Sequence, residues 1–542
     1  MYAADHTGAT PAPVSRAAIA RVIVVAMTIS RRSFLRAATG LAGGAALASY
    51  ARVIAQPRFV SSPFTLGVAS GYPSGNGVTL WTRLTESPTG GAIHGAHVNV
   101  HWELSEDDVF RTIAARGEAT ASPALAHSVH VDVAGLQPAR HYWYRFRAGD
   151  ALSPVGRTRT APQPGAATAR MRFAFAACQH YEQGYFTAFR HMAQEELELV
   201  VHLGDYIYES SWGRNHVRAH GSPTPHTLDD YRSRYALYKR DADLQAAHAA
   251  FPWLVTWDDH EVDNDYANDR SQDLAPREAF LARRAAAYQA YYEHMPLPSW
   301  ARPRGRDMRV YGSSAYGDIA SFFVLDTRQY RSHQVCTRPD RGGGNVVREE
   351  ACADLANPAL TMLGREQEQW LHESLGRSAA RWNIVAQQTL MAQADRRPGP
   401  GADYWTDGWD GYPRARERLL ASLYTQRVSN PIVLSGDVHM AAVTDLKLNN
   451  DDARSGVTAT ELVCPSISSQ GPSQTRVELI LQENPHIKFA NGARRGYTTV
   501  ELSPRRCVTR MRTIASVSEM DSSIRNLSIY AIEDGRPGAQ RV

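Results

Sequence analysis

Hydrophobic and polar residues follow two different patterns along the chain, and the change falls near residue 162. Before it, short runs alternate between apolar and polar positions, which is typical of half-buried strands. After residue 170, helical stretches alternate with short runs that are almost wholly apolar, which is typical of buried strands in an α/β domain. A stretch rich in Pro, Gly and Ala at residues 161–169 separates the two patterns and predicts a linker.

The first pattern predicts a domain of strands over residues 56–162. Its alternating runs occupy residues 64–84, 97–103, 127–133 and 142–147, with Gly and Pro turns between them. Strands at this spacing without long helices favour an all-β sandwich of the immunoglobulin or fibronectin III type. The Leu-Gln-Pro turn at residues 136–138, just before an aromatic run, resembles fibronectin III in particular.

The second pattern predicts an α/β (α+β) domain over residues 163–542. Apolar runs at residues 171–177, 199–203, 253–257, 321–325, 382–386 and 431–434 predict strands. Stretches at 186–196, 227–250, 365–375 and 414–424 predict helices between them, so we expect helices packed on a largely buried sheet. Strands recur with fewer helices from residue 457 onward.

The first 55 residues predict an export signal. A twin-arginine motif at residues 30–35 precedes a weakly apolar run at 37–48, and small residues near 48, 51 and 55 offer cleavage points. A membrane anchor is the alternative, but the run is too short and too rich in Gly and Ala to span a bilayer well. Met27 lies just before the motif and is a candidate for the true start. We therefore expect a periplasmic or secreted product without a membrane span, exported by the twin-arginine translocase.

Net charge and cysteine content limit the possible partners and the possible disulfide bridges. A net charge of +4 over 542 residues, without a dense Lys/Arg run, gives no reason to expect a nucleic-acid partner. Five cysteines leave at least one unpaired in an exported protein. Cys336 and Cys352 flank a Gly-rich loop that they are predicted to close. Cys464 and Cys507, both in strand-like runs, are predicted to form a second bridge, which leaves Cys178 free.

Four predicted strands end in side chains of the kinds that bind metal ions. In chain order these are Cys178 and His180, then Asp205 and Tyr208, then Asp258, Asp259, His260, Glu261, Asp263 and Asn264, and finally Asp437 and His439. Taken singly, the aspartates are explained as helix caps, Cys178 as a buried thiol and Tyr208 as a core aromatic. Their recurrence at four strand ends instead predicts a metal site at one edge of one sheet.

Taken together, these motifs resemble a known family. Gly-Asp, Asp-His-Glu and Gly-Asp-x-His in this order resemble the calcineurin-like metallophosphoesterase superfamily, and the fuller set resembles its alkaline phosphatase D (PhoD-like) family. That set comprises residues 175–180, 202–209, 231–235, 257–264, 325–331 and 434–439, together with the twin-arginine motif and the run at 78–84. The resemblance implies a metallophosphoesterase sandwich behind the N-terminal β-domain. It also implies an exported alkaline phosphatase that hydrolyses phosphomonoesters, and phosphodiesters as well.

The resemblance further implies Ca²⁺ and Fe³⁺ as cofactors, with Zn²⁺, Mn²⁺ or Co²⁺ as alternatives. Cys178 and Tyr208 would bind the ferric ion, Asp205 would bridge the two metals, and Asp437 and His439 would complete the shell. Ferric iron prefers anionic oxygen, whereas calcium accepts carboxylate, amide and water oxygens.

Two residues are candidates for one further ligand, and His260 and Arg328 are candidates for catalytic roles. Asp259 precedes His260 as the superfamily's Asn ligand does, but Asn264 is preferred because an amide oxygen suits calcium. His260 corresponds to a superfamily histidine that protonates the leaving alkoxide or binds a phosphoryl oxygen. Arg328 follows a predicted strand, and its guanidinium would match phosphate oxygens. An ion pair with a nearby acid is the other interpretation of Arg328.

The expected reaction is hydrolysis of a small-molecule phosphoester by a metal-activated hydroxide, with Asp205, His260, His439 and Arg328 as the catalytic group. We expect a monomer. A phospholipase D-type phosphodiesterase on the same scaffold is the first alternative. A surface-binding protein that uses the N-terminal β-domain for adhesion is the second.

Overall fold

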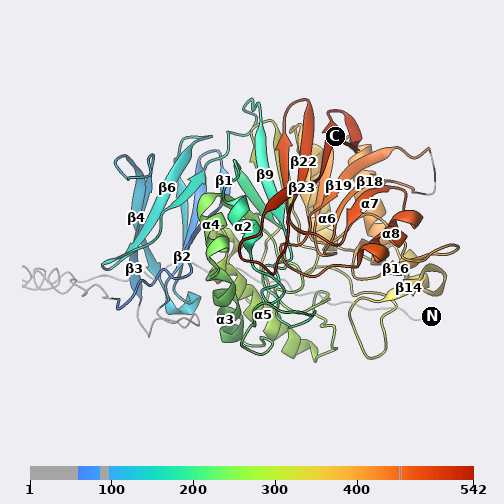
Figure 1. Ribbon diagram of the computed structural model, residues 1–542, viewed down its shortest axis with the longest axis horizontal. Coiled ribbons are helices and arrows are strands. Elements are labelled where there is room, and N and C mark those ends of the chain that lie inside the picture. Colours follow the sequence, from blue (N-terminus) through green and yellow to red (C-terminus); the bar gives the residue numbers. More distant parts are fainter. Residues whose placement is uncertain (1–58, 86–96, 451, 453) are drawn as a thin grey trace, which may run out of the picture. The chain divides into compact units, whose positions relative to one another are not determined.

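The strands expected after residue 170 divide between two sheets. The structure is a computed structural model, and it describes residues 59–85, 97–450, 452 and 454–542. The export signal predicted over residues 1–55, and the candidate start at Met27, lie outside these residues. Figure 1 shows the ribbon, in which a ten-stranded and a seven-stranded sheet contain most of the strands.

The ten-stranded sheet has a parallel centre formed by β9 (Met171–Ala176), β10 (Leu199–His202) and β11 (Pro252–Val255). All four residues of β10 are buried, which explains why the strand is apolar without alternation. Leu199 and Val201 pack between the sheets, whereas Val200 packs toward the helices. Antiparallel strands extend the sheet on one side: β21 (Arg495–Leu502), β22 (Arg506–Ile514), β23 (Ile524–Glu533) and β24 (Arg536–Arg541).

The seven-stranded sheet also has a parallel centre. It consists of β13 (Ala320–Val324), β15 (Trp382–Ala386), β17 (Pro431–Ser435) and β19 (Val457–Val463). Antiparallel strands flank this centre: β12 (Gly312–Tyr316), β18 (Ala441–Lys447) and β20 (Ile487–Asn491). A short separate pair consists of β14 (Val346–Arg348) and β16 (Asp403–Trp405).

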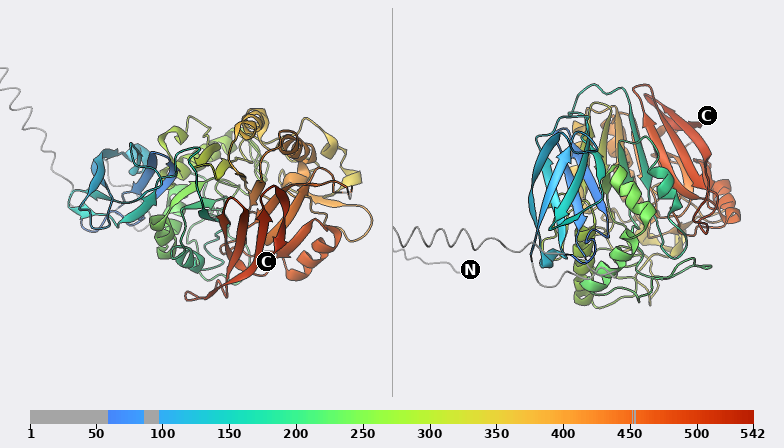
Figure 2. Two further views of the ribbon diagram at one scale, coloured as in Figure 1. Left: turned by 90° about the horizontal axis from the view of Figure 1, so that it is seen from above. Right: turned by 60° about the vertical axis from the view of Figure 1, so that its left-hand side comes forward.

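Helices cover the outer faces of the two sheets, which pack against each other through a shared apolar core. On the ten-stranded sheet lie α2 (Thr187–Met192), α3 (Leu228–Lys239), α4 (Ala242–Ala250) and α5 (Arg277–His294). On the seven-stranded sheet lie α6 (Gly364–Arg377), α7 (Pro413–Thr425) and α8 (Gln474–Glu483). Figure 2 gives two further views of these layers. The result is an α+β fold whose two sheets form a sandwich.

The N-terminal region is rich in strands, as predicted. A separate sheet contains β3 (Val98–Ser105), β4 (Ile113–Ala121), β6 (His141–Ala148), β7 (Ala151–Leu152) and β8 (Gly156–Arg159). It packs against β1 (Val68–Ser74), β2 (Gly77–Arg83) and β5 (Ser128–Ala134) through an apolar core of its own. Because β1 also pairs with β11, these three strands continue the ten-stranded sheet. The sheet therefore runs across the expected boundary at residue 162, and the immunoglobulin or fibronectin III type stays a prediction.

Two sequence expectations about the fold are wrong. The four motif-bearing strands do not share one sheet, because β17 belongs to the seven-stranded sheet. Cys464 and Cys507 are both free. Cys464 directly follows β19, near the end of the sheets where the motifs gather. Cys507 pairs with Leu502, which in turn pairs with Met171 at the start of β9, so it lies toward the opposite end of the strands.

The Cys336–Cys352 disulfide is confirmed and closes a loop between residues 16 positions apart. Replacing both cysteines by serine is expected to lower the free energy of unfolding by about 3 kcal/mol, because the unfolded chain regains the entropy of an open loop. Urea denaturation would measure this loss, with Cys464→Ser as the single-thiol control. Thiol titration of the unreduced, denatured wild type should find the three cysteines that are free. A count of one thiol would mean that a second bridge forms after all.

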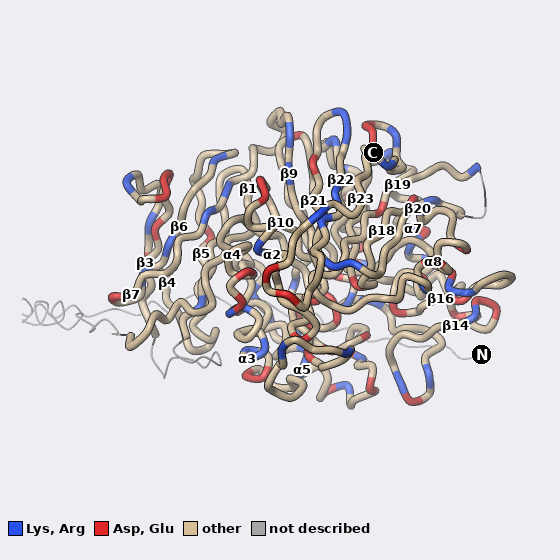
Figure 3. Tube along the Cα trace, viewed as in Figure 1, with Lys and Arg blue, Asp and Glu red and all other residues tan. Residues whose placement is uncertain are grey.

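Charged residues of both signs are interspersed along the described trace, as Figure 3 shows. The described helices include none that combines the length and the apolar character needed to cross a bilayer.

Candidate active site

The predicted site residues meet where the parallel strands of both sheets end. Cys178 follows β9, Asp205 follows β10, and Asp437 and His439 follow β17. All four residues have positive φ angles, between 51° and 62°, although none is glycine. Non-glycine residues rarely adopt this conformation, and they cluster at functional sites when they do. The chain thus turns sharply at each strand end and directs these side chains into one place.

Gly204 explains the Gly-Asp motif in steric terms. Its φ is +112°, and a Cβ atom there would lie 2.5 Å from both the backbone nitrogen and the Cβ of Asp258. Only glycine allows the loops after β10 and β11 to approach this closely. The motif therefore places Asp205 beside the acidic run that begins at Asp258.

The first cluster of donor atoms belongs to Cys178, Asp205 and His439, whose ligand atoms lie within 4.8 Å of one another. The Tyr208 hydroxyl joins it by donating to Asp205 Oδ2 over 2.8 Å, and it lies 3.0 Å from His439 Nε2. Ser469, in the loop after β19, donates to the same hydroxyl over 2.8 Å. Asp205 is buried, and its Oδ1 accepts no hydrogen bond in the described residues. A buried carboxylate oxygen without a partner requires a cation or a proton.

The second cluster consists of Asp258, Asp259 and Asp437, again with ligand atoms within 4.8 Å of one another. Asp259 also groups with Asp205 and His260 at that distance, so the two clusters are continuous. Thr389, after β15, donates to Asp437 Oδ2 over 2.6 Å and fixes its orientation. Burial raises the pKa of Asp437 to about 7, and it raises the pKa of Asp259 as well. Several carboxylates this close together favour a bound cation.

The pKa values of the Cys178 thiol and the Tyr208 phenol indicate that the first cluster needs a bound cation. Burial, and then the charge of Asp205, raise the pKa of Cys178 and of Tyr208 well above their ordinary values. The pKa of Asp205 moves in the opposite direction. Burial opposes its charge, but His260 and His439 outweigh this effect and hold the pKa well below its usual range. Thiolate and phenolate would therefore form here only with a cation to compensate them.

His260 is held by a carboxylate from another loop. Its Nδ1 lies 2.7 Å from Glu209 Oε2, and its ring lies over Tyr208 with the ring centroids 4.2 Å apart. Burial opposes a charge on His260, but Glu209, Asp205 and Asp259 outweigh burial and raise its pKa well above the ordinary value. A protonated imidazole with one nitrogen fixed by Glu209 can present the other as an acid.

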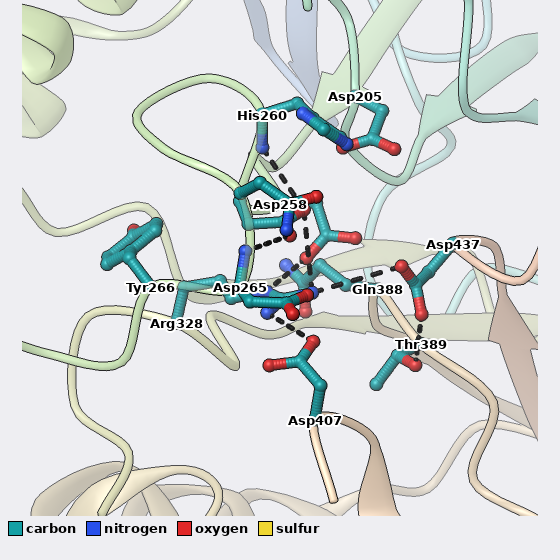
Figure 4. Close-up of polar contacts among 12 residues, drawn as sticks. Asp205, Asp258, His260, Asp265, Tyr266, Arg328, Gln388, Thr389, Asp407 and Asp437 are labelled. Atoms are coloured by element: carbon teal, nitrogen blue, oxygen red, sulfur yellow. Dashed lines mark hydrogen bonds and ion pairs between the residues drawn. The ribbon is translucent and has the colours of Figure 1, made fainter. Parts of the chain in front are cut away.

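Arg328 lies among the acidic residues with none of its side chain exposed (Figure 4). It forms ion pairs with Asp258 and with Asp407, the latter at 2.7 Å, and its Nη2 lies 3.5 Å from Asp259. This environment favours the ion-pair interpretation of Arg328 over direct contact with a phosphate. Asp407 also accepts from Arg331 over 2.6 Å, so the two arginines share one buried carboxylate.

Replacing Arg328 by methionine is expected to lower the free energy of unfolding by about 3–5 kcal/mol, because Asp258 and Asp407 would lose a buried counter-charge. Urea denaturation of the purified variant would measure the loss. Arg377→Met is the matched control, since Arg377 is exposed on α6 and should tolerate the change. A variant of normal stability with a raised KM would instead assign Arg328 to phosphate binding.

Asn264 forms hydrogen bonds with residues outside both clusters. Its amide nitrogen donates to Gln272 over 2.9 Å, and its backbone N–H donates to Glu209. Asp259 belongs to three groups of acidic and histidine side chains whose ligand atoms lie within 4.8 Å of one another in the described residues. The geometry therefore supports Asp259 as a ligand, and the preference for Asn264 stays an untested prediction.

Several residues that build the site were given no specific role in the sequence analysis. Glu261 accepts backbone hydrogen bonds from Asp205 over 3.0 Å, from Tyr206 over 2.6 Å and from Asp258 over 2.8 Å, and so ties two strand ends together. Glu209 fixes His260, whereas Ser469 and Thr389 orient Tyr208 and Asp437. Glu209 and Glu261 lie inside the motifs, where their charge was the available signal. Ser469 and Thr389 lie in loops without a distinctive pattern, so no sequence signal pointed to them.

The fold and the site together define a hydrolase of the metal-dependent type: donor atoms suited to two adjacent cations lie buried at the strand ends of a two-sheet α+β sandwich. Comparison with known proteins identifies the family of hydrolases to which the chain belongs. The family model described as PhoD-like phosphatase matches residues 173–511, and that of the PhoD-like phosphatase N-terminal domain matches residues 48–162. The chain belongs to the PhoD-like phosphatase family and is a phosphoric ester hydrolase.

Two relatives extend the match over nearly the whole chain. Alkaline phosphatase D of Bacillus subtilis (strain 168) is 45% identical over 532 residues, which are 95% of this chain and 89% of that protein. A solved structure of PhoD superposes with a TM-score of 0.85 at 46% identity, covering 90% of this chain and 93% of the other. The N-terminal β-rich region and the catalytic sandwich therefore occur together in these relatives too.

Proposed function

We propose that this protein is an exported alkaline phosphatase that hydrolyses phosphomonoesters, and also phosphodiesters, of small molecules. The observation that carries the proposal is the continuous buried cluster around Asp205, in which thiol, imidazole and carboxylate ligand atoms lie within 4.8 Å of one another and the Tyr208 hydroxyl lies 2.8 Å from Asp205 Oδ2. The B. subtilis relative is named for the same activity. The twin-arginine motif at residues 30–35 supports export to the periplasm or the medium.

The residues present fit two metal ions of different character. Cys178, Tyr208 and His439 would hold a ferric ion with one oxygen of Asp205, whose Oδ1 has no other partner in the described residues. Asp259 and Asp437 would hold calcium together with Asp205, since calcium prefers carboxylate oxygens. When bound, the metals neutralise charge on the phosphoryl group and make water a stronger nucleophile.

Residues of the chain itself would donate a proton to the leaving group and hold the metal-binding side chains in position. His260 would donate a proton from Nε2 to the departing alkoxide, because Glu209 holds its Nδ1. The indole of Trp212 stacks on the His439 ring with an interplanar angle of 7° and a centroid separation of 5.5 Å, which fixes that imidazole. Arg328 would pair with Asp258 and Asp407 without touching substrate, and with Arg331 it outweighs burial and holds the pKa of Asp407 well below its usual range.

Elemental analysis combined with a visible spectrum tests the metal assignment. Protein purified from its natural exporter should contain iron and calcium and show a tyrosinate–ferric charge-transfer band that is lost in Tyr208→Phe. A colourless enzyme that is active with zinc alone would refute the assignment of iron.

Substrate comparison tests the activity itself. We expect rapid release of phosphate from a phosphomonoester such as p-nitrophenyl phosphate and slower cleavage of its bis ester. Faster cleavage of phosphatidylcholine than of either compound would favour a phospholipase D-type enzyme. If metal-loaded protein hydrolyses none of these compounds, a surface-binding role remains.

Export and oligomeric state are tested separately. Replacing Arg31 and Arg32 by lysine should retain the precursor in the cytoplasm. Gel filtration of the wild type should give the mass of a monomer.

A further inference from the structure

The Gly-rich loop closed by the disulfide packs against the acidic network of the candidate site. We refer to its residues 341–344, which read Arg-Gly-Gly-Gly, as the glycine turn. A Cβ atom on Gly343 would lie 2.8 Å from the Cβ of Asp265, and one on Gly344 would lie 2.6 Å from the Cβ of Asp407. Only glycine allows an approach this close. The glycine turn therefore brings the backbone of the loop against two buried aspartates.

Asp265 is held both at its side chain and at its backbone carbonyl. Its Oδ2 accepts the backbone N–H of Gly344 over 3.1 Å and lies 3.2 Å from Arg341 Nη2. Its carbonyl oxygen accepts a hydrogen bond from the side-chain amide of Gln334 over 2.6 Å. Asp265 has a φ angle of 53°, a conformation that residues other than glycine keep only where their surroundings enforce it. Both of these contacts to Oδ2 come from the glycine turn.

The backbone N–H of Asp265 in turn fixes Asp259, which is proposed above as a calcium ligand. It donates to Asp259 Oδ2 over 2.7 Å, whereas Asp259 Oδ1 accepts the backbone N–H of His260 over 3.1 Å. One hydrogen bond at each oxygen fixes the plane of the carboxylate and leaves lone pairs for a metal ion. Partners that hydrogen-bond to metal ligands orient them, and their loss typically lowers metal affinity about 10–100-fold.

We propose that Asp265 is a positioning residue for Asp259, and that the glycine turn holds Asp265 in the conformation this role requires. A chain of two hydrogen bonds thus connects the disulfide loop to a calcium ligand, although Gly344 lies 79 positions beyond Asp265. The inference rests on the calcium assignment made under the proposed function.

The residues proposed to bind iron lie in other loops. Cys178 follows β9, Tyr208 lies between β10 and α3, and His439 lies between β17 and β18. Disturbing the glycine turn should therefore weaken calcium binding and leave iron in place. A general loss of folding would reduce both metals together, so the two metals distinguish positioning from a merely structural role.

The calcium dissociation constant of iron-loaded, calcium-depleted protein, measured by isothermal titration calorimetry, tests the proposal. Arg341→Met should raise this Kd about 10-fold, because Asp265 Oδ2 loses one of its two donors. The change of charge acts in the opposite direction, since removing a positive charge near a cation site strengthens cation binding. Arg338→Met is the matched control: it removes the same charge from an exposed position of the same loop and should leave the Kd unchanged.

Gly343→Ala disturbs the turn without any change of charge. Its new Cβ must displace Asp265, so the calcium Kd should again rise about 10-fold. Gly456→Ala is the control, because this glycine is exposed and a Cβ there would meet no atom within 4 Å. Iron content should equal that of wild type in all four variants. Saturating calcium should restore kcat in Arg341→Met and Gly343→Ala, because only the affinity for the ion is lost.

The outcomes separate this inference from the proposed function. A wild type that binds calcium and hydrolyses phosphoesters, with an equal calcium Kd in Arg341→Met and Gly343→Ala, would overturn the inference alone. Tighter calcium binding in Arg341→Met, or a parallel loss of iron and calcium in both variants, would also overturn it. A wild type that binds no calcium would overturn the calcium assignment and this inference with it.

Discussion

Replacing Asp205 by asparagine is expected to lower kcat/KM for a phosphomonoester by roughly 10³-fold, which corresponds to about 4 kcal/mol of transition-state stabilisation. The same change should reduce both iron and calcium in the purified protein. Asparagine keeps the shape of the side chain but removes the charge. It also replaces one carboxylate oxygen by an amide nitrogen, which cannot serve as a ligand. Steady-state kinetics and elemental analysis of one preparation would measure both effects.

The size of this effect follows from the position of Asp205 between the two clusters. Its ligand atoms group with Cys178 and His439 on one side and with Asp259 and His260 on the other. Asp445→Asn is the matched control: Asp445 is a buried aspartate on β18 that pairs with Lys488 over 2.9 Å, away from the strand ends. It should keep full metal content and activity. If Asp205→Asn keeps both as well, Asp205 does not bridge two metals.

Much of the site is predictable from sequence because parallel strands obey a simple rule. Apolar runs mark buried strands, and each such strand must end where the chain turns out of the sheet. Cys178, Asp205, Asp258 and Asp437 all occupy such ends, so their convergence follows once the strands are recognised. The sequence does not say which sheet each strand joins. A strand buried on both faces has no alternation that would distinguish the two sheets, and β17 was therefore assigned to the wrong one.

The partners of charged residues were much harder to predict than their positions. Arg328 follows a strand end as expected, but its ion pairs reach Asp258 and Asp407, which are 70 and 79 positions away. The preference for Asn264 over Asp259 rested on the chemistry of an amide oxygen, whereas the turn after β11 directs Asp259 into the cluster. Long-range contacts of this kind depend on how loops fold over the strand ends, and residue type alone does not encode them.

Replacing His260 by glutamine is expected to lower kcat by about 10²–10⁴-fold, the range typical of a lost general acid. Glutamine can still accept or donate hydrogen bonds but cannot transfer a proton at neutral pH. Iron and calcium content should stay close to wild type, in contrast to Asp205→Asn. The loss should be largest for substrates with poor leaving groups, such as alkyl phosphates, and small for p-nitrophenyl phosphate. An equal loss for both substrates would exclude His260 as the acid.

The pH dependence of the reaction tests most directly whether His260 is the general acid. The general acid must be protonated, so activity falls as pH rises through the pKa of His260. Because Glu209 and the neighbouring aspartates outweigh burial and raise this pKa well above its ordinary value, we expect the alkaline limb at higher pH than for a free imidazole. Glu209→Gln removes the closest of these charges and should move the alkaline limb of the kcat/KM profile to lower pH. Glu195→Gln, which changes a carboxylate paired with Arg512 at 2.9 Å, is the control and should leave the profile in place. If the acidic limb rather than the alkaline limb of the profile moves to lower pH in Glu209→Gln, His260 acts as a base instead.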